Sequence, residues 1–309
     1  MELISGLHNL RASHQPCVAT IGNFDGVHLG HQAVLGQLAE KGAAMGLPTT
    51  LITFEPQPHE YFIGKKAPAR LTSFREKFVT LNRFAIDQVL VLYFNQRLAS
   101  MEAEDFIQQI LIDGLNVQHL VVGDDFRFGN QRKGDFTLLE EFGERDGFSV
   151  VSMTSFNVDG ERVSSTAIRA ALVDGDFDRA ERLLGRHYHM TGIVAHGDKR
   201  GRQWGFPTAN IRMQRKVIPL RGVFAVEVFG LEHEPVFGVA NLGTRPTIDG
   251  IRTLLEVHLF DFSDDIYGKR INVVFRYKIR DEERFDSFDE LKEQIGRDVV
   301  VAKEYFDSV

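Results

Sequence analysis

The stretch Val18-Ala-Thr-Ile-Gly-Asn-Phe-Asp-Gly-Val-His-Leu-Gly-His31 decides how the first half of the chain folds. Its apolar, β-branched beginning predicts a strand, and the glycines around the Phe-Asp-Gly sequence predict a turn. The apolar residues from Val34 to Leu38 then recur at helical spacing. The stretch therefore predicts a strand, a glycine-rich turn and a helix that begins near His28 and His31.

His28 and His31 are three residues apart, so they share one face of the predicted helix. A helix N-terminus offers unpaired N–H groups and the positive end of a dipole, and both favour anions. Gly30, between the histidines, leaves the backbone open to the phosphates of a ligand. The pair therefore predicts an anion-binding site. Two alternatives stay open: ordinary surface histidines, and a zinc site, for which Cys17 is the only thiol and no third ligand is near in sequence.

Composition narrows the class of protein. The length of 309 residues suggests two domains, and 43% hydrophobic with 26% charged residues indicates a packed soluble protein. The net charge of −7 argues against non-specific nucleic-acid binding. No apolar run approaches the ~20 residues that span a bilayer, and the N-terminus does not resemble a signal peptide. The single cysteine fits a reducing compartment, so we expect a cytoplasmic protein. From the charge and the lack of a long apolar run, we expect no nucleic-acid or membrane partners. The sequence does not indicate the oligomeric state.

The first half alternates predicted strands with predicted helices. Strands are expected at 51–54, 89–94 and 120–123, with helical stretches at 75–84 and 103–112 between them. Continuous apolar strands that alternate with helices imply a parallel sheet covered on both faces. In such sheets, ligands bind beyond the carboxyl ends of the strands.

Three segments follow predicted strands or precede a predicted helix. The two prolines in Phe54–Glu60 predict an extended, non-helical segment. The Gly-Asp-Asp turn at 123–129, with Arg127, Arg132 and Lys133, fits a nucleotide loop and equally a charged surface loop. Ser164 and Ser165 are good N-cap residues, and Arg169 follows in the next helical turn. This second helix N-terminus suits a pyrophosphate, although plain capping explains the serines equally well.

A domain boundary is expected near the middle of the chain. A short helix is predicted to begin at the cap Asp176 and to end at Gly185. We place the boundary after it, so the predicted domains are residues 1–185 and 186–309.

The second half changes to a pattern of short strands. Turn-bounded strands are expected at 223–229, 236–241, 254–260 and 271–279, which suggests an antiparallel barrel or sandwich. A capping box at Ser287–Glu290 then begins a terminal helix whose apolar stripe can dock on the barrel.

Chemistry in the second half concentrates in two places. The basic, glycine-rich segment at 197–202 could wrap phosphates. Beyond it, Thr208 and Asn210 would share one face of an extended segment and suit Mg²⁺, which prefers oxygen ligands. Glu256 alternates with the predicted core residues Leu255 and Val257, so it points away from them; by itself it could be an ordinary surface carboxylate.

The motifs resemble known families. The Phe-Asp-Gly-Val-His-Leu-Gly-His string resembles the H-x-G-H motif of nucleotidyltransferases, in the form found in bacterial flavin adenylyltransferases. The Phe-Glu-Pro-x-Pro, Arg-Leu-Thr-Ser-Phe-Arg-Glu-Lys, Gly-Asp-Asp-Phe-Arg-Phe-Gly and Ser-Ser-Thr-x-x-Arg strings extend this similarity over almost all of residues 15–185. The Gly-Phe-Pro-Thr-Ala-Asn, Gly-Val-Ala-Asn-Leu-Gly-Thr-Arg-Pro-Thr and Leu-Glu-Val-His-Leu strings resemble riboflavin kinases over roughly 187–306. The chain thus resembles the bacterial bifunctional riboflavin kinase/FAD synthetases.

This resemblance implies an α/β nucleotidyltransferase domain followed by a β-barrel kinase domain. It implies that riboflavin is phosphorylated by ATP to FMN, and that FMN is adenylylated by a second ATP to FAD. It implies that Thr208 and Asn210 bind Mg-ATP, that Glu256 is the general base, and that His28 and His31 act in adenylylation. The residues assigned to substrate and nucleotide binding are Gly22, Phe24, Asp25, Gly30, Asp125, Ser164, Ser165, Thr166, Arg169, Lys199, Arg200, Gly201, Arg202, Pro207, Thr208 and Asn210.

Two positions depart from the family pattern, and two other functions are alternatives. Asp125 stands where some members have asparagine, and Ala167 where many have a second arginine. A different nucleotidyltransferase, such as a cytidylyl or pantetheine-phosphate adenylyl enzyme, would also carry H-x-G-H. A non-enzymatic flavin-binding protein would be expected to have lost the motif residues.

Overall fold

The computed structural model describes residues 1–196, 206–213, 215, 217–247 and 250–309. Contacts divide the chain into two compact units. The first comprises Met1–Pro68 and Lys77–Ser164, and the second comprises Ala69–Glu76 and Ser165–Val309. Among the helices in these ranges, none combines the length and the apolar character that crossing a membrane requires.

A six-stranded parallel sheet forms the centre of the first unit, as predicted. Its strands lie in the order β1-β4-β3-β2-β5-β6, and every neighbouring pair is parallel. The outer strands β1 and β6 were not predicted. The strands are β1 (Glu2–Ser5), β2 (Cys17–Ile21), β3 (Thr49–Glu55), β4 (Gln88–Tyr93), β5 (Val117–Gly123) and β6 (Ser149–Met153).

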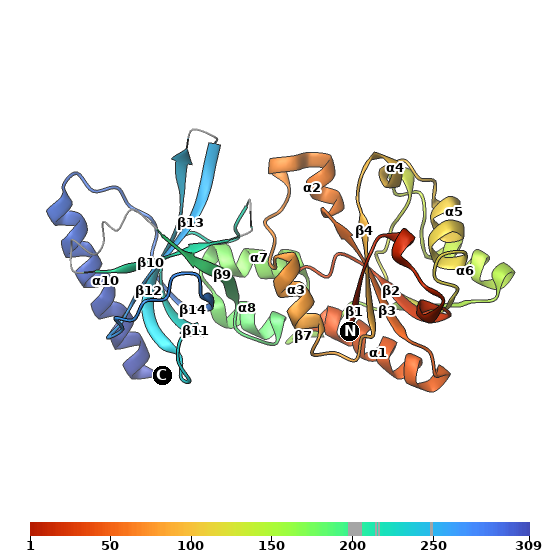
Figure 1. Cartoon of the computed structure of the whole chain (residues 1–309), viewed down its shortest axis with the longest axis horizontal. Helices are drawn as coiled ribbons and strands as arrows, with labels where there is room; N and C mark the ends of the chain where they lie inside the picture. The colour runs from red at the N-terminus through yellow and green to blue at the C-terminus, as the bar shows by residue number, and fades with distance from the viewer. Residues whose placement is uncertain (197–205, 214, 216, 248–249) are drawn as a thin grey trace. The chain divides into compact units, whose positions relative to one another are not determined.

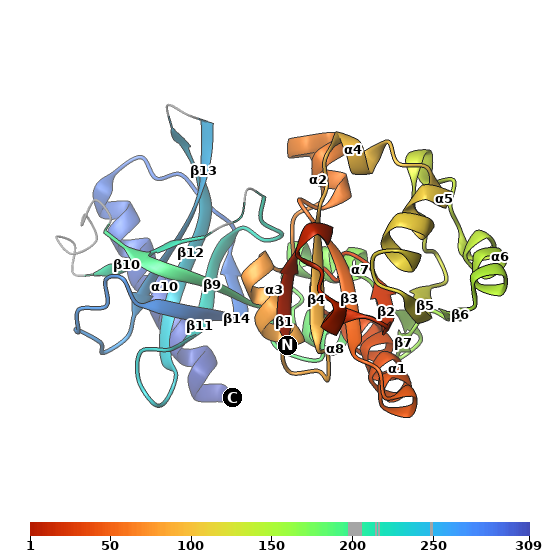
Figure 2. The ribbon, with the colours of Figure 1, turned by 45° about the vertical axis from the view of Figure 1, so that its right-hand side comes forward.

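Helices cover both faces of this sheet. On β3, Leu51 packs with Leu35 of α1, whereas its neighbour Ile52 packs on the opposite face with Leu111. Because successive strand residues point to opposite faces, two separate cores form. Figure 2 shows α5 and α6 lying together on one side of the strands. The helices are α1 (Leu29–Met45), α2 (Pro58–Ile63), α3 (Phe74–Leu81), α4 (Gln96–Ala99), α5 (Ala103–Phe106), which a π-helical turn (Ile107–Ile112) continues, and α6 (Phe136–Asp146); β7 (Asn157–Val158) and β8 (Glu161–Arg162) form a small hairpin.

The order of the strands places a topological switch beside β2. The chain runs from β2 outward to β3 and β4, and then returns to add β5 on the other side of β2. Ligands of open parallel sheets bind at such a switch, beyond the carboxyl ends of the strands. The His28–His31 stretch follows β2 and the Gly-Asp-Asp turn follows β5, so both lie where the topology favours a ligand.

One local prediction was wrong. The segment Phe54–Glu60 was expected to be non-helical, but α2 begins at Pro58. Proline is favoured in the first turn of a helix, where its missing N–H leaves no bond unmade. Glu60 also reaches back to accept from the N–H of Gln57 at 3.1 Å, which closes a capping box.

A closed six-stranded antiparallel barrel forms most of the second unit (Figure 1). The prediction left barrel and sandwich open; the ring closes because β9 pairs with both β10 and β14. Two helices precede it, and α8 lies between its expected cap Asp176 and Gly185. The elements are α7 (Ser165–Asp174), α8 (Phe177–Leu184), β9 (His189–Ala195), β10 (Thr208–Arg212), β11 (Gly222–Phe229), β12 (Val236–Thr247), β13 (Gly250–Leu259), β14 (Arg270–Arg280) and α10 (Phe288–Ser308).

The terminal helix α10 docks on the outside of the barrel, as predicted (Figure 1). The Ser287 side chain caps it by accepting from the N–H of Glu290 at 3.2 Å. Ala302 is fully buried and, with Val299, packs on Val223 and Val239 of the barrel. Burial of this stripe holds the helix in place.

A buried ion pair also secures α10, and we expect Asp298→Asn to weaken it. Arg280 donates from Nε and Nη2 to the two Asp298 carboxylate oxygens at 2.9 and 2.8 Å, and only 3% of Asp298 is exposed. Losing one charge-assisted bond should lower the free energy of unfolding by roughly 2 kcal/mol, measured as a shift of the urea midpoint. The exposed pair Arg297–Glu293 is the control, since Arg297→Ala should change stability by less than about 1 kcal/mol. Equal shifts for both variants would contradict a special role for Asp298.

Candidate active sites

His28 and His31 form a stacked pair at the start of α1. His28 is the N-cap residue, and its Nδ1 accepts a hydrogen bond from the backbone N–H of His31 at 3.3 Å. The two rings are stacked with centroids 3.6 Å apart, and the Phe24 ring lies 4.7 Å from that of His31. A Cβ on Gly30 would lie 3.3 Å from His28 Nδ1, so glycine leaves room for the ring. The two imidazoles therefore occupy the anion-favouring end of the helix.

The turn before this helix has an unusual backbone. Phe24 and Val27 have positive φ angles of 47° and 43°, which β-branched and bulky residues rarely adopt. Asp25 and Val27 are buried, so the turn is packed rather than loose. Strained backbone is retained where the surrounding structure enforces it, and it gathers at functional sites.

Lys77, which was not a predicted site residue, supports this turn. Its side chain is fully buried, and Nζ donates to the carbonyl oxygen of Asn23 at 2.6 Å. Thr53 of β3 lies 3.5 Å from the same nitrogen. A lysine is almost never fully buried unless it is paired. The residues around Lys77 in the sequence do not indicate this contact with Asn23, so only the fold reveals it.

The carboxylates beyond β5 face an arginine. Arg162 Nη2 donates to Asp125 at 3.2 Å and to Asp124 at 3.5 Å, while the Ser155 hydroxyl donates to Asp124 at 2.8 Å. Asp125, the predicted nucleotide contact, is exposed. Arg162 was not predicted as a site residue. It lies on β8, whose two-residue length gives no strand signal in the sequence.

Aromatic rings gather beyond the carboxyl ends of β3 and β4. Tyr61 and Phe62 of α2 both lie against Phe94, with centroids 5.5 and 5.7 Å apart. Phe62 is 64% exposed. A large exposed aromatic at this edge of the sheet offers a stacking surface to a planar ligand.

The Ser-Ser-Thr-x-x-Arg motif lies at the start of α7. Ser165 is the first helical residue, Ser164 precedes it, and Thr166 is exposed. Arg169 is half-buried, and its Nε donates to the carbonyl oxygen of Ala69 at 2.6 Å. By their contacts, α7 belongs to the second unit and the two histidines belong to the first, so each motif is described within its own unit.

In the barrel, three of the predicted kinase residues share one face. Asn210 of β10 is directly opposite Glu256 of β13, and Thr208 is opposite His258. Directly opposed residues carry Cβ atoms about 4.5–5.5 Å apart on the same side of the sheet. The alternation expected for β13 is confirmed, since Leu255 is fully buried and Glu256 only partly so. The barrel thus presents hydroxyl, amide and carboxylate oxygens together.

His258 fixes the beginning of β10. Its Nδ1 lies 2.9 Å from the carbonyl oxygen of Pro207. Because a carbonyl only accepts, Nδ1 carries the proton. Pro207, another predicted binding residue, is therefore held directly before Thr208.

The donor set of β10 and β13 suits a hard divalent cation. Thr208, Asn210 and Glu256 offer oxygen atoms on one face, which is the ligand type that Mg²⁺ prefers. Four predicted phosphate contacts lie outside the described residues: Lys199, Arg200, Gly201 and Arg202.

Comparisons with known proteins match the whole chain. The FAD synthetase family model matches residues 10–167, and the riboflavin kinase model matches residues 184–306. The protein of Escherichia coli K12 called bifunctional riboflavin kinase/FMN adenylyltransferase is 52% identical over 99% of this chain and 98% of its own. The Haemophilus influenzae protein of that name is 51% identical over 100% of both chains. A crystal structure described as a macrolide-efflux protein from Streptococcus pneumoniae covers 96% of this chain and 97% of its own, with a TM-score of 0.80 and 29% identity.

Proposed function

Because the chain belongs to the family of bifunctional riboflavin kinase/FMN adenylyltransferases, we propose that its two reactions are divided between its two halves. The chain phosphorylates riboflavin to FMN and adenylylates FMN to FAD, with ATP as the donor in both steps. We assign adenylylation to residues 1–185 and phosphorylation to residues 186–309. The separate family matches to 10–167 and 184–306 support this division. They do not favour a cytidylyl or pantetheine-phosphate adenylyl enzyme, or a non-enzymatic flavin-binding protein.

For adenylylation, the reacting group of FMN is already an anion. A phosphate oxygen of FMN bonds to the α-phosphorus of ATP while the bond from that phosphorus to the bridging oxygen breaks, and pyrophosphate leaves. The reaction therefore needs positioning and positive charge rather than a strong base. The observation that carries the assignment is the stacked His28–His31 pair at the N-terminus of α1. We assign these rings to the α-phosphate and the leaving group.

Other residues of the first half are assigned to substrate and nucleotide binding. Gly22, Phe24, Asp25 and Gly30 shape the turn, and the hydroxyls and guanidinium of the α7 motif suit the pyrophosphate. Exposed Phe62 suits the planar flavin ring. The assigned nucleotide contacts beyond the turn are Asp125, Ser164, Ser165, Thr166 and Arg169.

For phosphorylation, the attacking group is a neutral hydroxyl, so a nearby carboxylate base is useful. We assign this role to Glu256, which takes up the hydroxyl proton as the oxygen bonds to the γ-phosphorus and ADP leaves. The register that sets Glu256 opposite Asn210 supports the assignment. Both reactions use ATP with a divalent metal; we propose Mg²⁺, held in this half by Thr208 and Asn210, where it would neutralise phosphate charge.

A mixing experiment tests the division. His31→Ala should still make FMN from riboflavin, and Glu256→Gln should still make FAD from supplied FMN. A mixture of the two purified variants with riboflavin, ATP and Mg²⁺ should therefore form FAD, although each variant alone forms little. Chromatography of the products gives the readout. If the mixture forms no more FAD than the better single variant, the two activities are not divided in this way.

A further inference from the structure

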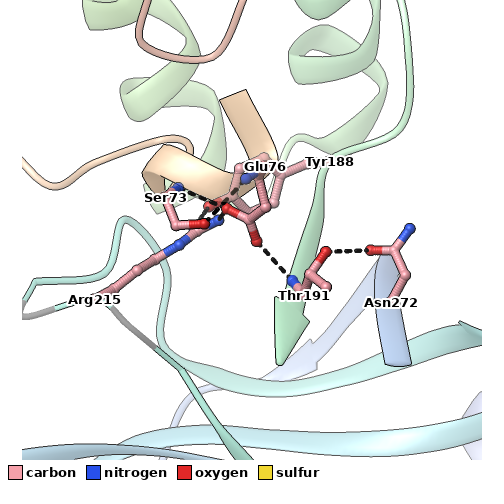
Figure 3. Close-up of polar contacts among 6 residues, drawn as sticks. All are labelled: Ser73, Glu76, Tyr188, Thr191, Arg215 and Asn272. Carbon is pink, nitrogen blue, oxygen red and sulfur yellow. Dashed lines mark hydrogen bonds and ion pairs between the residues drawn. The ribbon is translucent and has the colours of Figure 1, made fainter. Parts of the chain in front are cut away.

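A buried carboxylate from outside the second half completes the barrel unit. Residues 69–76 belong by their contacts to the second unit, and Glu76 ends that segment. Glu76 Oε1 accepts from the N–H of Thr191 at 2.6 Å, and Oε2 accepts from the N–H of Ser73 at 2.6 Å (Figure 3). Oε2 also forms an ion pair with Arg215 Nη2, and both side chains are only 2% exposed.

Both members of this pair are charged. Burial raises the pKa of the Glu76 carboxyl, but the Arg215 charge and the N–H groups of Thr191 and Ser73 outweigh it and hold the pKa below its usual range. Burial likewise opposes the charge of Arg215, but Tyr188 and Glu76 raise its pKa. A buried ion left without its partner is strongly destabilising. Arg215 can therefore stay buried only while Glu76 faces it.

The network joins β9 both to its neighbour β14 and to the chain that follows β10. Arg215 lies shortly beyond the end of β10, and its Nη1 donates to the hydroxyl of Tyr188 at 2.7 Å. Thr191 lies on β9, and its hydroxyl donates to Asn272 Oδ1 of β14 at 3.4 Å (Figure 3). Glu76 thus holds β9 through Thr191 and the chain after β10 through Arg215.

Strand β10 is the strand that carries the assigned metal and ATP contacts. Its Asn210 pairs with Ala195 of β9 on one side and is opposite Glu256 of β13 on the other. Without the Glu76 charge, we expect Arg215 to move toward water and to let the end of β10 shift Asn210 against Glu256. Misplacing reacting groups by about 1 Å can cost on the order of 10²-fold in rate.

We propose that Glu76 is a positioning residue of the riboflavin kinase reaction, because it fixes β9 and the chain after β10 and so sets where Thr208 and Asn210 stand relative to Glu256. This inference rests on the proposed assignment of phosphorylation to the second half. It makes a residue numbered within the first half a requirement of the second reaction.

The test uses the full chain with Glu76→Gln. Glutamine keeps the size but has only one acceptor oxygen. If that oxygen stays in the capping box with Ser73, the variant loses the charge facing Arg215 and also the bond from the Thr191 N–H, which are the two anchors under test. We expect kcat for riboflavin phosphorylation to fall by about 10- to 100-fold, with the KM for riboflavin changed less. Adenylylation of supplied FMN should stay within a few-fold of the parent. Rates are expressed per folded molecule, with the folded fraction measured by circular dichroism.

Asp298→Asn is the matched control, because it removes the charge of another buried carboxylate paired with arginine in the same unit. It should lower the unfolding midpoint while the kinase kcat stays near that of the parent. Glu256→Gln is measured beside it. If that variant keeps its kinase activity, the assignment of the second half fails, whatever Glu76 does.

A double variant keeps the test decisive if the Glu76→Gln protein does not fold. Glu76→Gln with Arg215→Met leaves no unpaired buried charge, so it should fold, yet it lacks the anchor after β10 and should keep the low kcat. Parent-like kcat in the double variant would overturn the proposal. So would a Glu76→Gln protein that loses stability but keeps its kcat per folded molecule, or one in which both reactions fall equally.

Discussion

Replacing Glu256 by glutamine is expected to lower kcat for riboflavin phosphorylation by about 10²–10⁴-fold, the usual contribution of a positioned base. Glutamine keeps the size of the side chain and can accept a hydrogen bond, but it cannot take up the hydroxyl proton. A loose phosphoryl-transfer transition state deprotonates its nucleophile late, which favours the lower end of this range. The measurement is kcat at saturating riboflavin and ATP, with binding determined separately, and adenylylation of supplied FMN should be spared.

Glu227→Gln provides the control for this experiment. Glu227 is another partly buried strand glutamate of the barrel, and its carboxylate lies 3.5 Å from Arg276 Nη1. It is not among the assigned site residues, so its variant should keep the parent kcat. A Glu256→Gln protein that works within a few-fold of the parent would remove Glu256 from the role of base.

His31→Ala is expected to lower FAD formation from supplied FMN by about 10²–10³-fold, the cost of losing one donor that stabilises developing charge. The helix should survive the change, because the cap runs from the His31 backbone N–H to His28 Nδ1. His28 loses the stacked ring of its neighbour. The assay supplies FMN, ATP and Mg²⁺ and follows pyrophosphate release, while riboflavin phosphorylation should stay near the parent.

His119→Ala tests whether any buried histidine of this sheet would have the same effect. His119 lies on β5 and its Nδ1 is 2.7 Å from the Ser149 hydroxyl, away from the motif in sequence. Its variant should retain adenylylation within a few-fold. An equal loss in both variants, or a parallel loss of both reactions in His31→Ala, would mean that the histidines support the fold rather than the chemistry.

The local elements of the fold could be predicted where periodicity was strong. The strand before the motif, the helix after it and the cap Asp176 all follow from short-range patterns. Closure of the barrel could not be predicted, because it depends on β9 pairing with both β10 and β14 across long stretches of chain. The helix at Pro58 was missed because proline ends helices in their interior but begins them at the first turn.

The candidate sites likewise contain residues that sequence patterns predict and contacts that only the fold shows. His28, His31 and Glu256 could be named from motif and alternation, whereas the pairing of Glu256 with Asn210 needs the register between β10 and β13. Lys77 and Arg215 are buried cations, and composition rules expect such side chains at the surface. Their partners, Asn23 and Glu76, are too distant in sequence for any local pattern to reveal them.

The separation between Glu76 and Arg215 also bears on how the protein is made. The two residues are 139 positions apart, and at the usual pace of translation the ribosome needs on the order of 10 s to add that many residues. During this time the emerging Glu76 carboxylate lacks the Arg215 guanidinium that neutralises it in the folded protein. Residues 69–76 can therefore take their final place only after the barrel strands have left the ribosome, so the barrel unit matures late although part of it is synthesised early.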